Sequence, residues 1–105
     1  MFTLKIATLN VNGINDDRIQ VKLVSYLRLN GIQIAAIQEH NIKIISKLKY
    51  VDKFYHIILN SSIQHKGGTL FLLDRQLPIN ISQVYLHPTS RICTAHITIF
   101  DSNFI

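Results

Sequence analysis

The stretch that decides the fold lies near the N-terminus: LKIATLNVNGIN, residues 4–15. Its apolar part predicts a buried β-strand over residues 3–11, and the polar residues Asn10 and Asn12 come at the end of that strand. One interpretation is a turn, because Asn-Gly is among the strongest turn signals. The other is that the strand end presents side-chain amides to a metal ion or a phosphate group. Choosing between them requires the residues that follow.

The next segment, INDDRIQVKLVSYLRLNG at residues 14–31, has the period of an amphipathic helix. Its apolar face consists of Ile19, Leu23, Val24 and Leu27. Asp16 or Asp17 can cap the start of this helix, and Gly31 supplies a stop signal. The run IQIAAIQE, residues 32–39, is almost continuously apolar, as expected of a strand covered on both faces. Strand, helix and strand in this order predict two parallel strands.

The rest of the chain predicts a short helix and more strands. The segment HNIKIISKLKYVDKF, residues 40–54, has an ambiguous pattern, in which Ile42, Ile45 and Leu48 could line a short helix. The further strands are expected at residues 55–60, 67–74, 81–86 and 91–100, with turn-forming residues between them. Residues 101–103 predict a hairpin turn, and residues 104–105 the beginning of another strand. The prediction is an α/β domain with about six strands, one long helix and a second, short one.

Composition narrows the class of protein. A chain of 105 residues with 48% hydrophobic and 16% charged residues is expected to form at most one domain and is not typical of a disordered protein. The excess of 11 basic over 6 acidic residues gives a net charge of +5, which favours polyanionic partners such as nucleic acid or an anionic membrane surface. Small basic proteins without an anionic ligand are also common. The one modest cluster of positive charge comprises Lys43, Lys47, Lys49 and Lys53.

Redox and targeting signals are sparse. Cys93 is the single cysteine, so an intrachain disulfide is excluded. The sequence contains no recognisable signal peptide and no run of about eighteen apolar residues that predicts a membrane span. We therefore expect an intracellular protein with no membrane partner.

Two polar pairs are expected at the ends of the first two strands: Asn10 with Asn12, and Gln38 with Glu39. Because the carboxyl ends of parallel neighbours meet at one edge of a sheet, Asn10 and Glu39 are expected within a few ångströms of each other. An amide and a carboxylate suit Mg²⁺, which takes oxygen ligands and keeps several waters. Alternatively, the asparagines form turns and Glu39 is a solvated loop residue. Spacing alone favours this simpler alternative and leaves the metal site open.

The series "ATLNVNGI", a helix, "IAAIQEH" and "KGGTLFLL" resembles the endonuclease/exonuclease/phosphatase superfamily. Within it, the sequence looks most like the apurinic-like endonuclease domain of non-LTR retrotransposons. The resemblance implies a partial four-layer α/β sandwich and metal-dependent hydrolysis of a phosphodiester. It also implies that Asn10 and Asn12 are catalytic residues around the scissile phosphate. Glu39 would be the ligand of Mg²⁺ or Mn²⁺, and His40 fits a "QEH" variant of the motif.

The sequence also departs from the family pattern. The family has a tyrosine in a "YxP"-like segment, a later Asp-x-Asn pair and a terminal Ser-Asp-His or similar motif, and no convincing match to any of them is found. Residues 101–103 read Asp-Ser-Asn but come too early, and Tyr85 in "VYLHP" is only superficially similar. We therefore expect residues 1–105 to be the N-terminal half of one domain, inactive by itself and holding Mg²⁺ only when the domain is complete.

The resemblance and the basic charge together imply DNA as the partner and allow a nuclear location. The substrate-binding residues cannot be identified from the sequence. Three alternatives remain: a phosphatase or a repair nuclease of the same superfamily, a degenerate remnant, or a small interaction protein. Without a second half, the apolar sheet face and its strand edge would be exposed, so the isolated chain is expected to self-associate.

Overall fold

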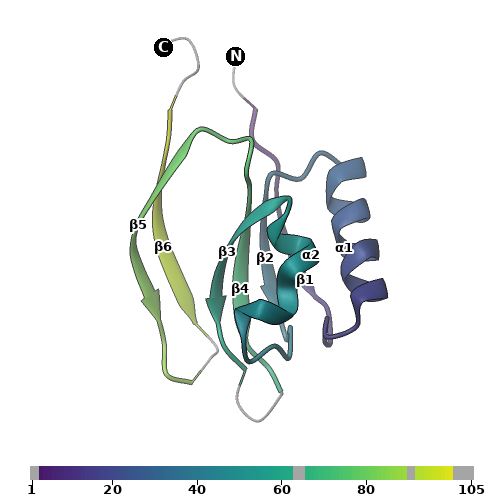
Figure 1. Ribbon diagram of the computed structural model, residues 1–105. Coiled ribbons are helices and arrows are strands. Elements are labelled where there is room, and N and C mark those ends of the chain that lie inside the picture. The colour runs from purple at the N-terminus through teal and green to yellow at the C-terminus, as the bar shows by residue number, and fades with distance from the viewer. Residues whose placement is uncertain (1–2, 63–65, 90–91, 101–105) are drawn as a thin grey trace.

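The computed structural model describes residues 3–62, 66–89 and 92–100. The elements, in chain order, are β1 (Ile6–Asn10), α1 (Asp17–Leu29), β2 (Ile34–Gln38), a 3₁₀ helix η1 (Ile45–Leu48), α2 (Lys49–Asp52), β3 (Tyr55–Asn60), β4 (Thr69–Asp74), β5 (Ile79–Leu86) and β6 (Cys93–Ile99) (Figure 1). These elements confirm the predicted α/β fold and its six strands. The expected turn at residues 101–103 and the strand beginning at residue 104 lie outside the described residues.

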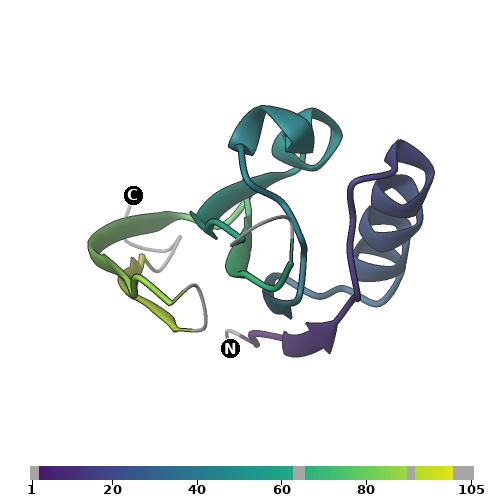
Figure 2. The ribbon, with the colours of Figure 1, turned by 90° about the horizontal axis from the view of Figure 1, so that it is seen from below.

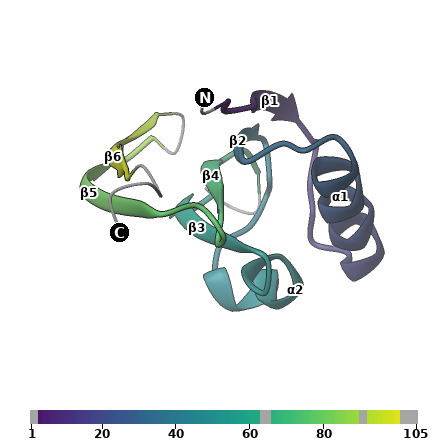
Figure 3. The same cartoon turned by 90° about the horizontal axis from the view of Figure 1, so that it is seen from above.

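The strands form two sheets. The first has the order β1-β2-β4-β3, in which β1 and β2 are parallel, as predicted, and the other neighbours are antiparallel. The second sheet is the antiparallel pair β5-β6. The helices cover one face of the first sheet and β5-β6 covers the other (Figure 2, Figure 3). The described residues thus make three layers of the expected four-layer sandwich.

Helix α1 has the predicted N-cap, but its buried face differs from the predicted one at one position. The Asp16 side chain accepts a hydrogen bond of 2.8 Å from the backbone N–H of Arg18, which satisfies one of the unpaired donors of the first turn. Leu23, Val24 and Leu27 are buried against the first sheet. The prediction for Ile19 is wrong, because its side chain is 44% exposed. The position next to it on the helix, Gln20, is fully buried instead.

Gln20 is buried because its amide joins two segments. Its Nε2 donates to the carbonyl of Ile14 and to the carbonyl of Lys47, both at 2.9 Å. A buried amide is tolerated when it replaces the hydrogen bonds it would make to water. Hydrophobic periodicity does not register such a residue, so the sequence pattern favoured Ile19.

The first strand is less buried than predicted. β1 spans Ile6–Asn10 rather than residues 3–11, and its residues alternate between exposed and half-buried. Among the described strands it has only β2 as a neighbour, at the edge of the sheet, and Ile6 is 61% exposed. An apolar run predicts burial only if both faces are covered, and the second sheet does not bury this part of β1.

The segment after β2 folds as η1 followed directly by α2. Ile42 and Leu48 are buried, as predicted, but Ile45 is 49% exposed and does not line the helix. The helical layer and the first sheet enclose one core, in which Leu27, Ile37 and Leu72 are at most 1% exposed.

A second, smaller core lies between the two sheets. Ile34, Ile58 and Leu73 of the first sheet pack against half-buried residues of β5 and β6, including Ile81 and Ile97. No residue of β5 or β6 whose exposure is described is fully buried. The second sheet is therefore only half covered, in contrast to β2 and β4.

Candidate functional site

The structure brings the predicted polar residues together at the carboxyl ends of β1 and β2. Asn10 is opposite Gln38 in the parallel register. The pairing continues beyond the strands, where Val11 N donates to the carbonyl of Gln38 at 3.1 Å and Gly13 N donates to the carbonyl of Glu39 at 2.7 Å. We call residues 10–15 and 38–41 the rim. Asn10, Asn12 and Glu39 all have exposed side chains there.

The backbone of the rim is unusual. Asn12, Glu39 and Asn41 have positive φ angles of 48°, 57° and 60°, and Gly13 has φ 97°. Residues other than glycine rarely adopt this left-handed conformation, and such strain tends to cluster at functional sites. The chain bends at Asn12 but does not turn back, because Val11, Gly13 and Ile14 continue the hydrogen bonds to residues 38–40. This bend leaves the side chain of Asn12 exposed.

The two glycines just before β4 support Glu39 from the other side. Glu39 N donates to the carbonyl of Gly68 at 2.8 Å, and Asn41 N donates to the carbonyl of Gly67 at 2.8 Å. The side chain of Asn41 closes the loop, since its Oδ1 accepts from Gly67 N at 2.8 Å. The backbone of Glu39 is thus held on both sides. Its exposed carboxylate makes no hydrogen bond or ion pair within the described parts of the chain.

His40 is the buried support of the rim. Its ring Nδ1 accepts from Ile42 N at 2.8 Å, which places the ring proton on Nε2, and Nε2 donates to the carbonyl of Asn60 at 2.8 Å. Burial lowers the pKa of His40 below its usual value, although the hydrogen bond to Asn60 opposes this shift. We conclude that His40 is a neutral structural residue rather than a proton donor at the surface.

The His40 ring also explains why a glycine stands at position 68, just before β4. A Cβ atom on Gly68 would lie 2.4 Å from two ring atoms of His40, and Gly68 has φ +91°. Only glycine fits both constraints. The His40 ring of "QEH" therefore packs directly against Gly68 of "KGG", and this contact joins the end of β2 to the start of β4.

Asn60 ties the rim to the second sheet. Its Nδ2 donates to the carbonyl of His87 at 3.0 Å and to that of Ile92 at 2.8 Å. Neither Asn60 nor Asn41 was identified by sequence reasoning. The only signal was that both are polar residues at the ends of apolar runs, a feature shared by most turns.

The donors at the rim fit a magnesium ion bound through few protein ligands. The side chains of Asn10, Asn12 and Glu39 offer two amide oxygens and one carboxylate, all of the hard oxygen type that Mg²⁺ prefers. Within the described residues, no cluster of three or more His, Cys, Asp or Glu side chains has metal-binding geometry. The set therefore suits a hydrated Mg²⁺ held by one carboxylate rather than a closed protein cage.

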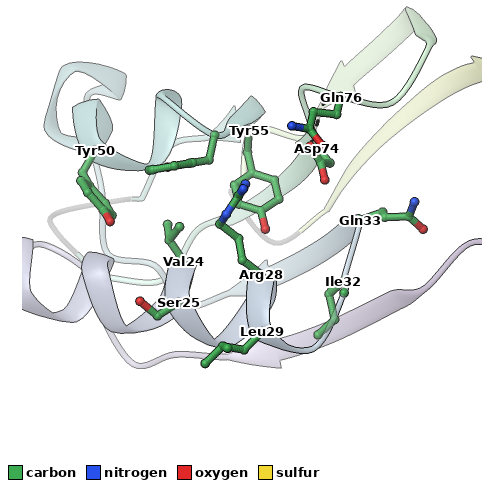
Figure 4. Close-up of a pocket in the computed structure, with 12 residues that line it drawn as sticks. Val24, Ser25, Arg28, Leu29, Ile32, Gln33, Tyr50, Tyr55, Asp74 and Gln76 are labelled. Atoms are coloured by element: carbon green, nitrogen blue, oxygen red, sulfur yellow. Dashed lines mark hydrogen bonds between the residues drawn. The ribbon is translucent and has the colours of Figure 1, made fainter.

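A separate cavity of about 760 Å³ lies at the opposite end of β2 from the rim (Figure 4). Arg28, Tyr55 and Asp74 line it. The guanidinium of Arg28 lies 4.9 Å from the ring centre of Phe54, an arrangement that stabilises the packing of α1 on the segment between α2 and β3. Burial, followed by the charge of Asp74, raises the pKa of Tyr55. None of the residues predicted from the sequence to act in catalysis lines this cavity.

No helix among the described residues is long and apolar enough to cross a membrane. No protein-family model and no curated protein matches the sequence. Among solved structures, D. rerio TDP2 in complex with a single-strand DNA product is similar at a TM-score of 0.64 and 20% identity, over 91% of this chain and 41% of that chain. A humanized D. rerio TDP2 with 14 mutations is similar at a TM-score of 0.62 and 21% identity, over 91% of this chain and 42% of that one. This chain therefore has part of the endonuclease/exonuclease/phosphatase fold and spans less than half the length of these proteins.

Proposed function

We propose that this chain is the N-terminal half of a Mg²⁺-dependent endonuclease domain that cleaves phosphodiester bonds in DNA. The observation that carries the proposal is the rim, where Asn10 and Glu39 stand on the ends of two parallel, hydrogen-bonded strands. The resemblance of "LNVNG" and "IQEH" to retrotransposon endonucleases makes an apurinic-like enzyme of that kind the preferred parent.

The side chains of the rim have complementary roles in this proposal. The Glu39 carboxylate holds the divalent cation, Mg²⁺ or Mn²⁺. Asn10 and Asn12 orient the scissile phosphate by donating amide hydrogens to its oxygens. When bound, the cation supplies charge stabilisation at the phosphoryl oxygens. The hydrogen bonds to Gly13 and Gly68 hold the backbone of Glu39, so the point from which its side chain projects is fixed before the substrate binds.

DNA is the preferred substrate for two reasons. The chain carries a net charge of +5, which favours a polyanion. The similar TDP2 structure was solved with a single-strand DNA product, so the shared fold accommodates nucleic acid in at least one protein. A superfamily phosphatase or repair nuclease remains the alternative within the same chemistry.

The isolated chain is expected to be inactive. Residues 1–105 contain one matching carboxylate and no convincing counterpart of the later Asp and His motifs, which activate water in the family. Catalytic groups that act as a unit lose nearly all of the rate when central members are missing. The remaining groups would come from a second half of the domain.

The test begins with the transcript. We would sequence it through and beyond the codon for Ile105 and then express the whole open reading frame. The expected result is Mg²⁺-dependent nicking of supercoiled plasmid, lost in Glu39→Ala, together with Mn²⁺ binding detected by electron paramagnetic resonance and lost in the same variant. Asn80→Ala, an exposed change on β5, serves as the control. Full Mg²⁺-dependent cleavage by Glu39→Ala would refute the proposed role of Glu39.

A second candidate function is non-catalytic association with a partner through the exposed apolar residues of the two sheets. It is favoured by the exposure of Ile6 on β1 and of Val84 and Tyr85 on β5. Exposed apolar residues and free strand edges promote association. Size-exclusion chromatography of the 105-residue chain is expected to show self-association, and a monodisperse, cooperatively unfolding monomer would contradict this candidate.

A further inference from the structure

A basic groove of about 670 Å³ lies in the helical layer, between the first turns of α1 and the η1–α2 segment. Three exposed lysines line it: Lys47, Lys49 and Lys53. Among the described residues that line it, Asp17 is the one carboxylate. Three lysines and one aspartate give the groove two net positive charges.

The neighbouring acidic side chains do not neutralise these lysines. Asp52 of α2 forms an ion pair of 2.9 Å with Arg75, whose Nε also donates to the carbonyl of Asp52. Asp16 forms an ion pair of 3.0 Å with Arg18. These two are the ion pairs formed within the described residues, so the groove lysines are unpaired there. Their charge is available to a ligand.

An aromatic side chain forms part of the groove wall. Tyr50 is half-buried and lies against Phe54, with 5.3 Å between the ring centres. The Nζ atom of Lys53 is 5.8 Å from the centre of the Tyr50 ring. Positive charge beside an aromatic ring is typical of surfaces that bind single-stranded nucleic acid, where phosphates meet lysines and bases meet rings.

The groove is attached to the rim by direct hydrogen bonds. Asn15 belongs to both the groove and the rim, and its Nδ2 donates to the carbonyl of Asn41 at 3.1 Å. Gln20 joins the carbonyls of Ile14 and Lys47. The first turn of α1 and η1 lie at the same end of the first sheet as the carboxyl ends of β1 and β2 (Figure 1). A strand held in the groove would therefore pass close to the rim.

We propose that this groove binds the phosphate backbone of a single nucleic-acid strand next to the rim. This inference rests on the proposed function, from which it takes nucleic acid as the ligand, and it adds the surface that binds the strand. An anionic membrane surface is less well suited, because these lysines converge on a concave groove instead of lining one flat face.

The experiment measures binding of the 105-residue chain to a fluorescein-labelled single-stranded DNA of about 12 nucleotides, within the site sizes of single-strand binding folds. Fluorescence anisotropy is recorded in EDTA at salt concentrations between about 50 and 200 mM, where phosphate contacts have a strong effect. The groove variant is Lys47→Gln/Lys53→Gln. The matched control is Lys5→Gln/Lys22→Gln, which removes the same charge from exposed residues that do not line the groove.

The groove variant is expected to bind roughly 10- to 30-fold more weakly at about 0.1 M salt, with a salt slope smaller by about 1.4, since each lost contact to a single strand removes about 0.7. The control is expected to stay within about twofold of the original chain. Equal losses in both variants, or no binding by the original chain, would overturn the inference. Binding to phosphatidylserine vesicles through the same lysines, without DNA binding, would also overturn it.

The proposed nuclease and the groove fail in different ways. Groove-dependent DNA binding without Mg²⁺-dependent nicking by the whole open reading frame would leave the groove standing and refute the nuclease. Nicking that is unchanged in Lys47→Gln/Lys53→Gln, together with unchanged DNA affinity, would refute the groove alone. Circular dichroism melts of both variants check that the surface changes leave the fold intact.

Discussion

The two faces of the first sheet differ in how completely they are covered. On the helical face, Leu27, Ile37 and Leu72 are at most 1% exposed. On the other face, β5 and β6 contribute half-buried residues only, among those whose exposure is described. Apolar burial is the main source of stability, so most of the folding free energy is expected on the helical side. Of the two strands that end at the rim, β2 belongs to this well-covered core, whereas β1 is a half-exposed edge strand.

The largest expected effect comes from truncating a core residue of the helical face. Ile37→Ala removes a fully buried side chain and leaves a cavity, so it should lower the free energy of unfolding by about 2–5 kcal/mol. Ile97→Ala makes the same chemical change in β6, where the side chain is only half-buried, and should cost clearly less. Urea denaturation of both variants measures the difference. Equal losses would show that the two faces contribute alike.

The next effect is at the rim. Gly68→Ala would place a methyl group 2.4 Å from the His40 ring and force an alanine to φ +91°. The cost should be about 3 kcal/mol, from the left-handed backbone and the collision together. Gly31→Ala is the control, because Gly31 has φ +63° but nothing within 4 Å of the new methyl, and it should cost only about 1 kcal/mol. Thermal melts that rank the two variants in the opposite order would contradict the contact with His40.

Asn60 joins the well-covered part of the molecule to the poorly covered part. Asn60→Ala removes both hydrogen bonds to the β5–β6 hairpin and should cost about 1–3 kcal/mol. Hydrogen exchange is the informative measurement, since amides of β5 and β6 should exchange faster while those of β2 and β4 stay protected. Asn80→Ala, an exposed change on β5, is the matched control. Uniform acceleration across both sheets would mean that the two sheets unfold as one unit.

The smallest effect is a pH dependence at Tyr55, in the helical core. Because burial and the charge of Asp74 raise the pKa of Tyr55, folding favours the neutral phenol. Its contribution to stability is therefore present below the ordinary tyrosine pKa of about 10 and is lost as the pH rises through the higher value of the folded state. Tyr55→Phe should weaken the loss of stability above about pH 10, compared with Tyr26→Phe on the exposed side of α1. An identical alkaline profile in both variants would refute this.

Sequence reasoning was most successful where local pattern and structure agree. It predicted the parallel pairing of β1 and β2, and residues 55–60 are the bounds of β3. It was wrong where burial depends on a distant partner. Ile19 and Ile45 have the right spacing but face solvent, and β1 is half-exposed because it is an edge strand.

The candidate site was predicted in outline only. Two parallel strands bring their carboxyl ends together, so the proximity of Asn10 and Glu39 followed from the order of the elements. The order of the elements did not predict which residues support the site. The side chains of His40 and Asn60 act on backbone groups twenty or more residues away, and no periodicity encodes such a contact.

The sequence by itself determined which segments are helices and strands, and that two polar strand ends share one edge of a sheet. Those features depend on propensity and on the alternation of apolar residues, which act over a few neighbours. The tertiary structure alone decided which apolar residues are covered, which tautomer His40 adopts and why Gly68 must be glycine. Each of these depends on atoms that the chain brings together only after it has folded, because packing and desolvation are properties of the whole assembly of elements.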